Sequence, residues 1–158
     1  MRKRLIDHVG MHLQSGSLPV PIESIAQVEV SSEAAGSPIE AALTPGASGW
    51  KAAAPGEQRI RILFDEPRLL RRLTLKFLES ERSRTQEFVL TWSAVAGNPS
   101  HVIVRQQWTF TPTGSTTESE VYDVEIDHVR ILELMIKPDI NDSSAIATLA
   151  EWRAFAVR

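Results

Sequence analysis

The sequence lacks the features that define several large classes of protein. It contains no cysteine, which excludes disulfide bonds, thiol nucleophiles and cysteine-ligated metal sites. No apolar run approaches the roughly 20 residues that cross a bilayer as a helix, so no membrane-spanning segment is expected. A formal net charge of -3 lacks the basic excess that usually meets a nucleic-acid backbone, so nucleic acid is not expected as the dominant partner.

Catalytic motifs are also missing. The sequence has no Gly-x-Ser-x-Gly elbow, no Walker loop and no dinucleotide-binding glycine fingerprint, so the common hydrolase, nucleotidase and dehydrogenase classes lose their local support. A carboxylate pair for glycoside hydrolysis stays open at this stage, because such a pair is defined by a distance in space. We therefore expect a protein that is not an enzyme and that needs no cofactor.

The first 24 residues are predicted to be an arm and linker outside the folded domain. Residues 1–14 could form a short helix or an extended arm, and two prolines beside a Gly-Ser pair favour a loop after them. The basic opening resembles a secretory signal, but Asp7, His8 and His12 interrupt the apolar run that a signal requires. We therefore expect a cytoplasmic location and one domain over residues 25–158.

The rest of the chain alternates apolar and polar residues, a pattern typical of strands buried on one face. The clearest stretch begins at Trp50, passes a Pro55-Gly56 turn, alternates over residues 60–64 and is expected to stop at Pro67. Similar segments, separated by turn residues, are 25–30, 39–43, 73–77, 88–92, 102–110, 122–126, 132–136 and 149–157. About eight or nine short strands predict an all-β protein, an antiparallel β-sandwich or jelly roll, with a closed barrel as the competing architecture.

Several short motifs in this order resemble the discoidin-type, galactose-binding-like jelly-roll family. They are Val28-Glu29-Val30-Ser31-Ser32-Glu33, Glu40-Ala41-Ala42-Leu43, Gly49-Trp50, the strand at 60–64 and the closing Ala147-Thr148-Leu149-Ala150-Glu151-Trp152-Arg153-Ala154-Phe155. A narrower resemblance, over Trp50-Lys51-Ala52-Ala53 and Gly56-Glu57-Gln58, is to the amino-terminal domain of the single-strand-break DNA repair scaffold. The resemblance implies a binding module for glycans, lipid head groups, protein partners or damaged DNA, and it does not select among them.

The same resemblance raises the question of a metal ion. Many members of that superfamily hold a structural calcium between an acidic loop before the tryptophan and a glutamate on the last strand, which here corresponds to Glu151. The matching loop at 43–49 contains no carboxylate, whereas calcium takes about six to eight oxygen ligands, several of them usually charged. Calcium is therefore disfavoured, although backbone carbonyl groups could supply ligands. The oxygen-rich stretch at 139–142 is interpreted as a turn built on Asx side chains.

Candidate ligand contacts are Trp50, Lys51, Arg84, Gln86 and Gln107. Trp50 could offer a stacking platform to a sugar ring or a base, but burial in the core is the favoured alternative. Arg84 and Gln86 precede an apolar strand and could hydrogen-bond hydroxyl or phosphate groups, or else form a solvated turn. An exposed tryptophan beside these groups would be the strongest support for a carbohydrate site.

Two functional hypotheses follow. The first is a non-catalytic module that binds carbohydrate, or a related polar ligand, through loops at one end of a β-sandwich. The second is an intracellular domain that docks a protein partner or nicked DNA on a sheet face. A concave loop cup with an aromatic floor would favour the first, and a contiguous exposed apolar or basic patch would favour the second.

Overall fold

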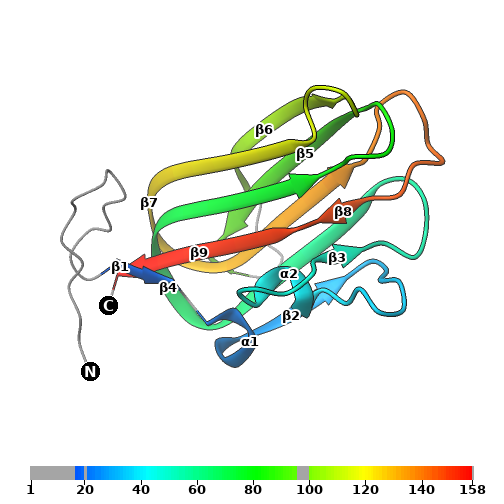
Figure 1. Ribbon diagram of the computed structural model, residues 1–158. Coiled ribbons are helices and arrows are strands. Elements are labelled where there is room, and N and C mark those ends of the chain that lie inside the picture. Colours follow the sequence, from blue (N-terminus) through cyan, green and yellow to red (C-terminus); the bar gives the residue numbers. More distant parts are fainter. Residues whose placement is uncertain (1–16, 20, 96–99, 158) are drawn as a thin grey trace.

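Two strands of 21 residues each, β4 (Gln58–Leu78) and β7 (Thr117–Lys137), pair with each other as a two-stranded ribbon. This ribbon bends sharply near its middle (Figure 1). The computed structural model describes residues 17–19, 21–95 and 100–157. Pairing is interrupted between Leu63 and Arg68 of β4, close to His128 of β7, which has a left-handed backbone (φ 60°). Because the ribbon bends there, each strand contributes one half to each of two packed layers.

The other strands extend the two halves of this ribbon into two antiparallel sheets. The first sheet has the order β2, first half of β4, second half of β7, β5 and β6, with β2 at Ala26–Val30, β5 at Arg84–Ser93 and β6 at His101–Phe110. The second has the order β1, β9, second half of β4 and first half of β7, with β1 at Ser17–Pro19 and β9 at Glu151–Val157. Within the described residues, β6 and the first half of β7 each pair on one side only, so they are edge strands.

Three smaller elements complete the fold. They are the strand pair β3 (Trp50–Lys51) and β8 (Thr148–Leu149), and the helical turns α1 (Ile22–Ile25) and α2 (Glu40–Leu43). Gly49, just before β3, has a φ of 94°, and a Cβ at this position would meet the Leu149 carbonyl oxygen at 3.0 Å. A glycine is therefore required where β3 approaches β8 and directs Trp50 into the core.

The core lies between the two sheets and is built from every second residue of their strands. Ile60 and Ile62 from the first sheet and Leu73 and Phe77 from the second are all fully buried. Phe77 stacks on Phe88 across the two layers, with 5.3 Å between the ring centroids. The two-residue period of the sequence is thus the period that fills the sandwich, and the predicted all-β sandwich is confirmed.

Two predictions about single segments are wrong. Residues 39–43 were predicted as a strand, but the helical turn α2 forms there. Glu40 and the two alanines after it favour helix, and the Leu43 side chain is buried on the inner side of the turn. Pro67 does not end a strand. It lies in the interruption of the β4–β7 pairing, where its missing N–H removes no sheet hydrogen bond, so the segments 60–64 and 73–77 belong to one strand.

The chain joins the sheet before residue 25, where the domain was expected to start. Ser17–Pro19 pairs with β9, and Ile22 is buried in the core. The helix or arm predicted at residues 1–14 lies outside the described residues. Among the helices that the structure describes, none is long and apolar enough to span a membrane.

Candidate functional site

Four loops meet at the end of the sandwich opposite to the end where β1 begins and β9 finishes (Figure 1). These loops comprise residues 52–57, 79–83, 111–116 and 138–147, and we call this the loop end. The Gly56 amide donates to the Ala145 carbonyl oxygen at 2.9 Å, and the Ile140 amide donates to the Thr85 carbonyl oxygen at 2.8 Å. Backbone hydrogen bonds therefore hold the longest loop against its neighbours.

A hollow of about 430 Å³ opens at the loop end, and we call it the loop-end hollow. It is lined by Gly56, Glu57, Lys137, Pro138, Asp139, Ile140, Asn141, Asp142 and Ser143. None of these nine residues is aromatic, so the hollow lacks the aromatic floor that was expected of a sugar site. Its apolar surface comes from Ile140, which is 44% exposed. The volume and the mixture of two apolar side chains, Pro138 and Ile140, with several polar ones suit a small polar ligand.

The loop at 138–144 is fixed by its own side chains. The Asn141 amide donates to Asp139 Oδ1 at 3.0 Å, and Ser144 donates its amide and hydroxyl to Asp142 Oδ1 at 2.9 and 2.6 Å. Hydrogen bonds from Ser144, with a smaller contribution from Arg82 at 3.3 Å, lower the pKa of Asp142, which is therefore ionised at neutral pH. The predicted Asx turns are confirmed, and the lining groups of the hollow are held in place before any ligand binds.

Arg84 anchors this loop from inside the sandwich. The residue is 3% exposed. Its Nε donates to Glu79 Oε1 at 2.7 Å and its Nη1 donates to the Pro138 carbonyl oxygen at 2.7 Å, while the guanidinium lies 4.7 Å from the centre of the Phe110 ring. Burial alone would raise the pKa of Glu79, but hydrogen bonds from Arg84 and neighbouring amides lower it, so the pair is ionic. One arginine therefore joins the loops at 79–83 and 138–147.

A chain of polar side chains leads from Arg84 deeper into the sandwich. Arg84 Nη1 also donates to Gln86 Oε1 at 3.1 Å, and Gln86 Nε2 donates to Glu118 Oε1 at 3.2 Å. Gln86 and Glu118 are fully buried. Burial, and next the neighbouring Glu120 carboxyl group, raise the pKa of Glu118 to about 8. Glu118 is therefore largely protonated at neutral pH.

The structure does not bring the predicted ligand contacts together. Trp50 is 2% exposed and its indole Nε1 donates to the Ser32 carbonyl oxygen at 3.0 Å, so it belongs to the core and gives no platform. Arg84 and Gln86 face inward, because they occupy the same alternation as the core residue Phe88, and both side chains are buried.

The remaining candidates lie apart. Lys51 is exposed on β3 but does not line the loop-end hollow, and Gln107 is exposed on the outer face of β6, where it donates to Glu87 Oε2 at 3.0 Å. Of the other tryptophans, Trp152 is buried and Trp92 and Trp108 are half-buried. The favoured alternative for Trp50, burial in the core, is therefore confirmed, and the part of the chain that the structure describes has no exposed tryptophan beside the polar loop residues.

The described residues do not fit a structural calcium ion of the kind that the resemblance implies. Among them, no group of three or more histidine or carboxylate side chains could hold a metal ion. Glu151 has no carboxylate from the loop at 43–49 to join it. Two residues further along β9, Arg153 Nη1 donates to the Ala42 carbonyl oxygen of α2 at 2.8 Å, so a guanidinium binds a carbonyl group next to this loop.

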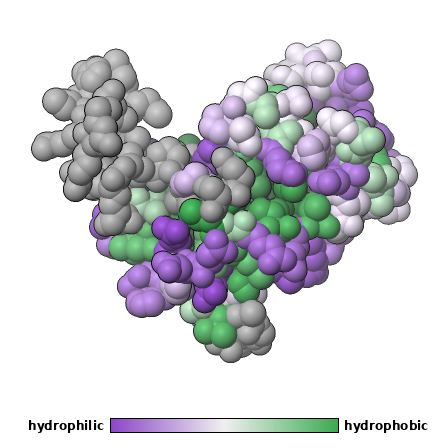
Figure 2. All heavy atoms as spheres, turned by 90° about the horizontal axis from the view of Figure 1, so that it is seen from below, coloured by the Kyte–Doolittle hydropathy of each residue, from purple (hydrophilic) through white to green (hydrophobic). Residues whose placement is uncertain are grey.

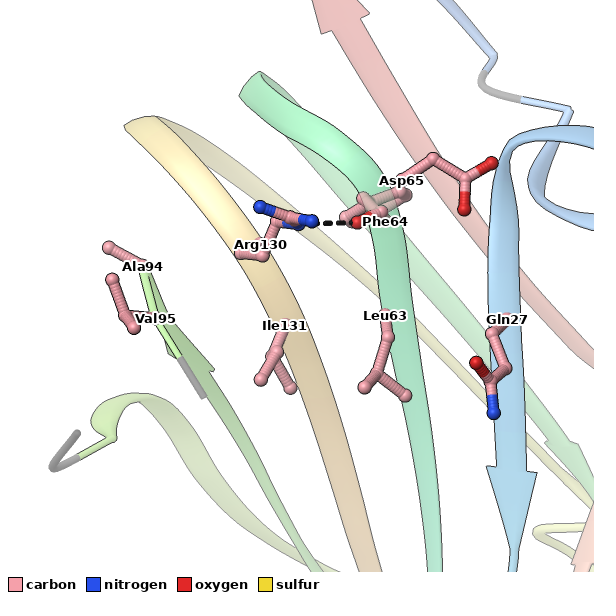
Figure 3. Close-up of a pocket in the computed structure, with 8 residues that line it drawn as sticks. All are labelled: Gln27, Leu63, Phe64, Asp65, Ala94, Val95, Arg130 and Ile131. Atoms are coloured by element: carbon pink, nitrogen blue, oxygen red, sulfur yellow. Dashed lines mark hydrogen bonds between the residues drawn. The ribbon is translucent and has the colours of Figure 1, made fainter. Parts of the chain in front are cut away.

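A second hollow, of about 420 Å³, lies on the outer face of the first sheet near the bend of the ribbon (Figure 3). Leu63 and Ile131, which pair across β4 and β7, form its floor, and Gln27 of β2 stands beside them. Arg130 lies above and donates its Nε to the Phe64 carbonyl oxygen at 2.7 Å. We call this the sheet groove.

Figure 2 gives the distribution of apolar side chains over one face of the molecule. Seen from below, hydrophobic side chains gather in the middle of this face and hydrophilic side chains surround them. Large hydrophobic residues that are exposed in the described chain include Val102 and Val121, at 62% and 58%. Single exposed apolar residues are common on protein surfaces, and they do not by themselves make the contiguous patch that the docking hypothesis asks for.

The fold is shared with solved carbohydrate-binding modules. The family 32 module of NanJ from C. perfringens, in complex with galactose, superposes with a TM-score of 0.61 at 12% identity, over 88% of this chain and 98% of that one. The chain has a galactose-binding-like jelly-roll fold. The module CBM32-3 of a family 31 glycoside hydrolase from Clostridium perfringens superposes with a TM-score of 0.63 at 16% identity, over 89% of this chain and 95% of that one.

A further solved structure with this jelly roll is a family 32 module from Clostridium perfringens in complex with GalNAc-β-1,3-galactose. Its TM-score is 0.62 at 14% identity, over 88% of this chain and 100% of that one. No protein-family model matches the sequence, and no curated protein matches it. The TM-scores establish the shared fold, whereas identities this low do not identify a ligand.

The first prediction concerns Arg84. In Arg84→Met, Glu79 keeps a partly buried charge without its partner and the Pro138 carbonyl oxygen loses its donor, so the free energy of unfolding should fall by ~3–5 kcal/mol. Arg82→Met, which removes the exposed contact with Asp142, should give no measurable change and serves as the matched control. Urea unfolding of both variants is the measurement; equal effects of the two changes would show that Arg84 does not anchor the loops.

The second prediction concerns the pH dependence of stability. The pKa of Glu118 in the folded protein is raised to about 8 from an ordinary value of 4.5. Its contribution to stability is therefore complete below about pH 4.5 and is lost as the pH rises through 8. Glu118→Gln cannot ionise, so its stability relative to the wild type should rise between pH 5 and pH 9 by on the order of a few kcal/mol.

Urea unfolding of the wild type and of Glu118→Gln at several pH values is the measurement. Glu125→Gln is the control, because Glu125 lies on the exposed face of the same strand. A difference between wild type and Glu118→Gln that stays constant with pH would mean that Glu118 titrates normally in the folded state.

Proposed function

We propose that this chain is a non-catalytic carbohydrate-binding domain whose ligand occupies the loop-end hollow. The observation that carries the proposal is a jelly-roll fold, shared with modules solved with galactose and GalNAc-β-1,3-galactose, that presents a hollow with several polar side chains, formed by loops at one end of the sandwich. Loops held by a rigid sandwich are where such folds can vary their ligand contacts.

The side chains of the hollow favour a neutral saccharide. Glu57, Asp139 and Asp142 bring carboxylates to its lining and Lys137 brings one ammonium group. Carboxylates accept hydrogen bonds from sugar hydroxyl groups. Glu57 and Asp142 are paired with Arg59 and Arg82 at 3.4 and 3.3 Å, so the repulsion that the carboxylate of an acidic sugar would meet comes chiefly from Asp139. The Asn141 side chain adds an amide donor and acceptor.

Binding through this hollow should be weak. Ile140 offers an apolar surface to the C–H face of a pyranose ring, but it cannot supply the stacking energy of an aromatic ring. With few hydrogen bonds and no aromatic platform, we expect dissociation constants from about 0.1 to 1 mM. Affinity of this order becomes useful when several modules or a repetitive glycan act together.

Two carboxyl groups with shifted pKa values at or near the hollow lack the properties of a glycosidase acid. A glycosidase needs one protonated acid beside the glycosidic oxygen. Asp142 has a lowered pKa and is ionised, so it does not supply this proton. Glu118 has a raised pKa, but it is fully buried beneath the loops and has no access to a bound sugar. This arrangement supports binding without catalysis.

The test is a titration of the isotope-labelled protein with galactose, GalNAc-β-1,3-galactose and galacturonate, followed by amide chemical shifts. We expect the two neutral sugars to move the amides of residues 56–57 and 137–143, and galacturonate to have a smaller effect. In Asn141→Ala, affinity for the neutral sugars should fall roughly fivefold, since a hydrogen bond contributes about 1 kcal/mol.

Gln27→Ala in the sheet groove is the matched control, because it also removes an amide from a hollow. Binding should be unchanged in this variant. The absence of shifts with all three sugars, or shifts confined to residues around Leu63 and Ile131, would overturn the proposal. The second of these results would place the saccharide in the sheet groove instead of the loop-end hollow.

A further inference from the structure

The interior of the sandwich becomes polar on the side where the two edge strands face each other. Arg84 and Gln86 of β5 pair with Phe110 and Trp108 of β6, and their side chains share the inward face with Glu118 on β7. Four buried polar atoms in this region have no hydrogen-bond partner, namely Arg84 Nη2, Trp108 Nε1, Glu118 Oε2 and Glu120 Oε2. Leaving buried polar atoms unpaired is costly, so this concentration calls for an explanation.

The two glutamates explain part of it. Glu118 and Glu120 are separated by one residue on the same face of β7, where they pair with Phe77 and Leu75 of β4. Two ionised carboxylates so close together in the interior would repel each other strongly. A single proton placed between Glu118 Oε2 and Glu120 Oε2 would remove this repulsion, and it would give both unpaired oxygens a hydrogen bond.

The other side chains around Glu118 and Glu120 are compatible with a proton shared between them. On β7, burial and the nearby Glu120 and Glu118 raise the pKa of Tyr122, so its hydroxyl group stays neutral. From β6 the inward groups are the neutral Gln106 and Trp108, and from β4 they are apolar. Arg84 is the cation that faces the pair, and its own partner Glu79 lies on the Nε side of the guanidinium.

Three hydrogen bonds connect Glu118, the buried member of the glutamate pair, to the loop-end hollow. Glu118 Oε1 accepts from Gln86 at 3.2 Å, Gln86 Oε1 accepts from Arg84 at 3.1 Å, and the same Arg84 nitrogen donates to the Pro138 carbonyl oxygen at 2.7 Å. Pro138 lines the hollow. We call Arg84, Gln86 and Glu118 the polar relay. All three side chains are at least 97% buried, so each moves only if its neighbours rearrange.

We propose that Glu118 and Glu120 share one proton inside the sandwich, and that losing this proton loosens the loop-end hollow and weakens ligand binding. After the proton is lost, both carboxyl groups of the pair are negatively charged. Arg84 Nη2, which has no hydrogen-bond partner, can then donate a hydrogen bond to this pair. Drawing the guanidinium toward Glu118 lengthens its bond to the Pro138 carbonyl oxygen and frees the loop at 138–144. The weakening of binding rests on the proposed saccharide site, whereas the shared proton and the loop response do not.

The first experiment needs no ligand. The carboxyl carbons of the two glutamates and the amides of Ile140 and Asn141 are followed by NMR between pH 5 and pH 10. We expect one carboxyl titration with a midpoint near 8, and the same midpoint in the amide shifts of the loop. In Glu118→Gln the loop amides should show no such step, whereas Glu125→Gln, on the exposed face of β7, should retain it. If Glu118→Gln does not fold, Glu120→Gln tests the same pair.

The second experiment titrates galactose into the wild type and Glu118→Gln at pH 6 and pH 9. We expect affinity to fall at least fivefold from pH 6 to pH 9 in the wild type and to stay constant in Glu118→Gln. Carboxyl groups that both titrate below pH 6, or loop amides without a step near pH 8, would overturn the inference. If galactose binds at neither pH while the loop amides show the step, the proposed function fails and the proton-linked loop stands.

Discussion

β4 and β7 are hydrogen-bonded to each other in both layers, so neither sheet can form without half of each of these two strands. The bend that makes this possible combines an interruption of pairing at Pro67 with the left-handed backbone of His128. Once the ribbon is bent, its inward side chains face one another and the core closes around Phe77 and Phe88. The loops that end these strands are then collected at one end, which is where the loop-end hollow lies.

The same ribbon leaves one side of the sandwich open, because β6 and the first half of β7 are not paired with each other. The interior near these two edges contains the polar relay of Arg84, Gln86 and Glu118, in contrast to the apolar interior beside β2 and β9. Such a network is less favourable than apolar packing unless every group is satisfied. Here it also positions a loop, since Arg84 binds Glu79 and the Pro138 carbonyl oxygen at once. Fold stability and the shape of the hollow therefore depend on the same side chains.

The fold was predictable from the sequence because alternation along a strand is a local property. That the segments 60–64 and 73–77 form one strand across Pro67 could not be predicted, because it depends on the pairing of both segments with β7. Candidate site residues were predicted less well: Arg84 and Gln86 are polar residues next to a turn, and only their register with Phe88 shows that they point inward. Glu118 and Glu120 could have been found by extending the alternation of Tyr122, Val124 and Ile126 backwards, which places both carboxyl groups inside. The expectations of a cytoplasmic location and of a relation to the DNA repair scaffold domain stay predictions.

Native-state hydrogen exchange, measured amide by amide at increasing denaturant, tests most directly whether the bent ribbon makes one cooperative unit of the two sheets. The account predicts that amides of both halves of β4 and β7 exchange through the same opening, with the free energy and the denaturant dependence of global unfolding. Exchange of the second half of β4 with β9 through a separate opening, at a clearly lower free energy than the first half, would contradict it.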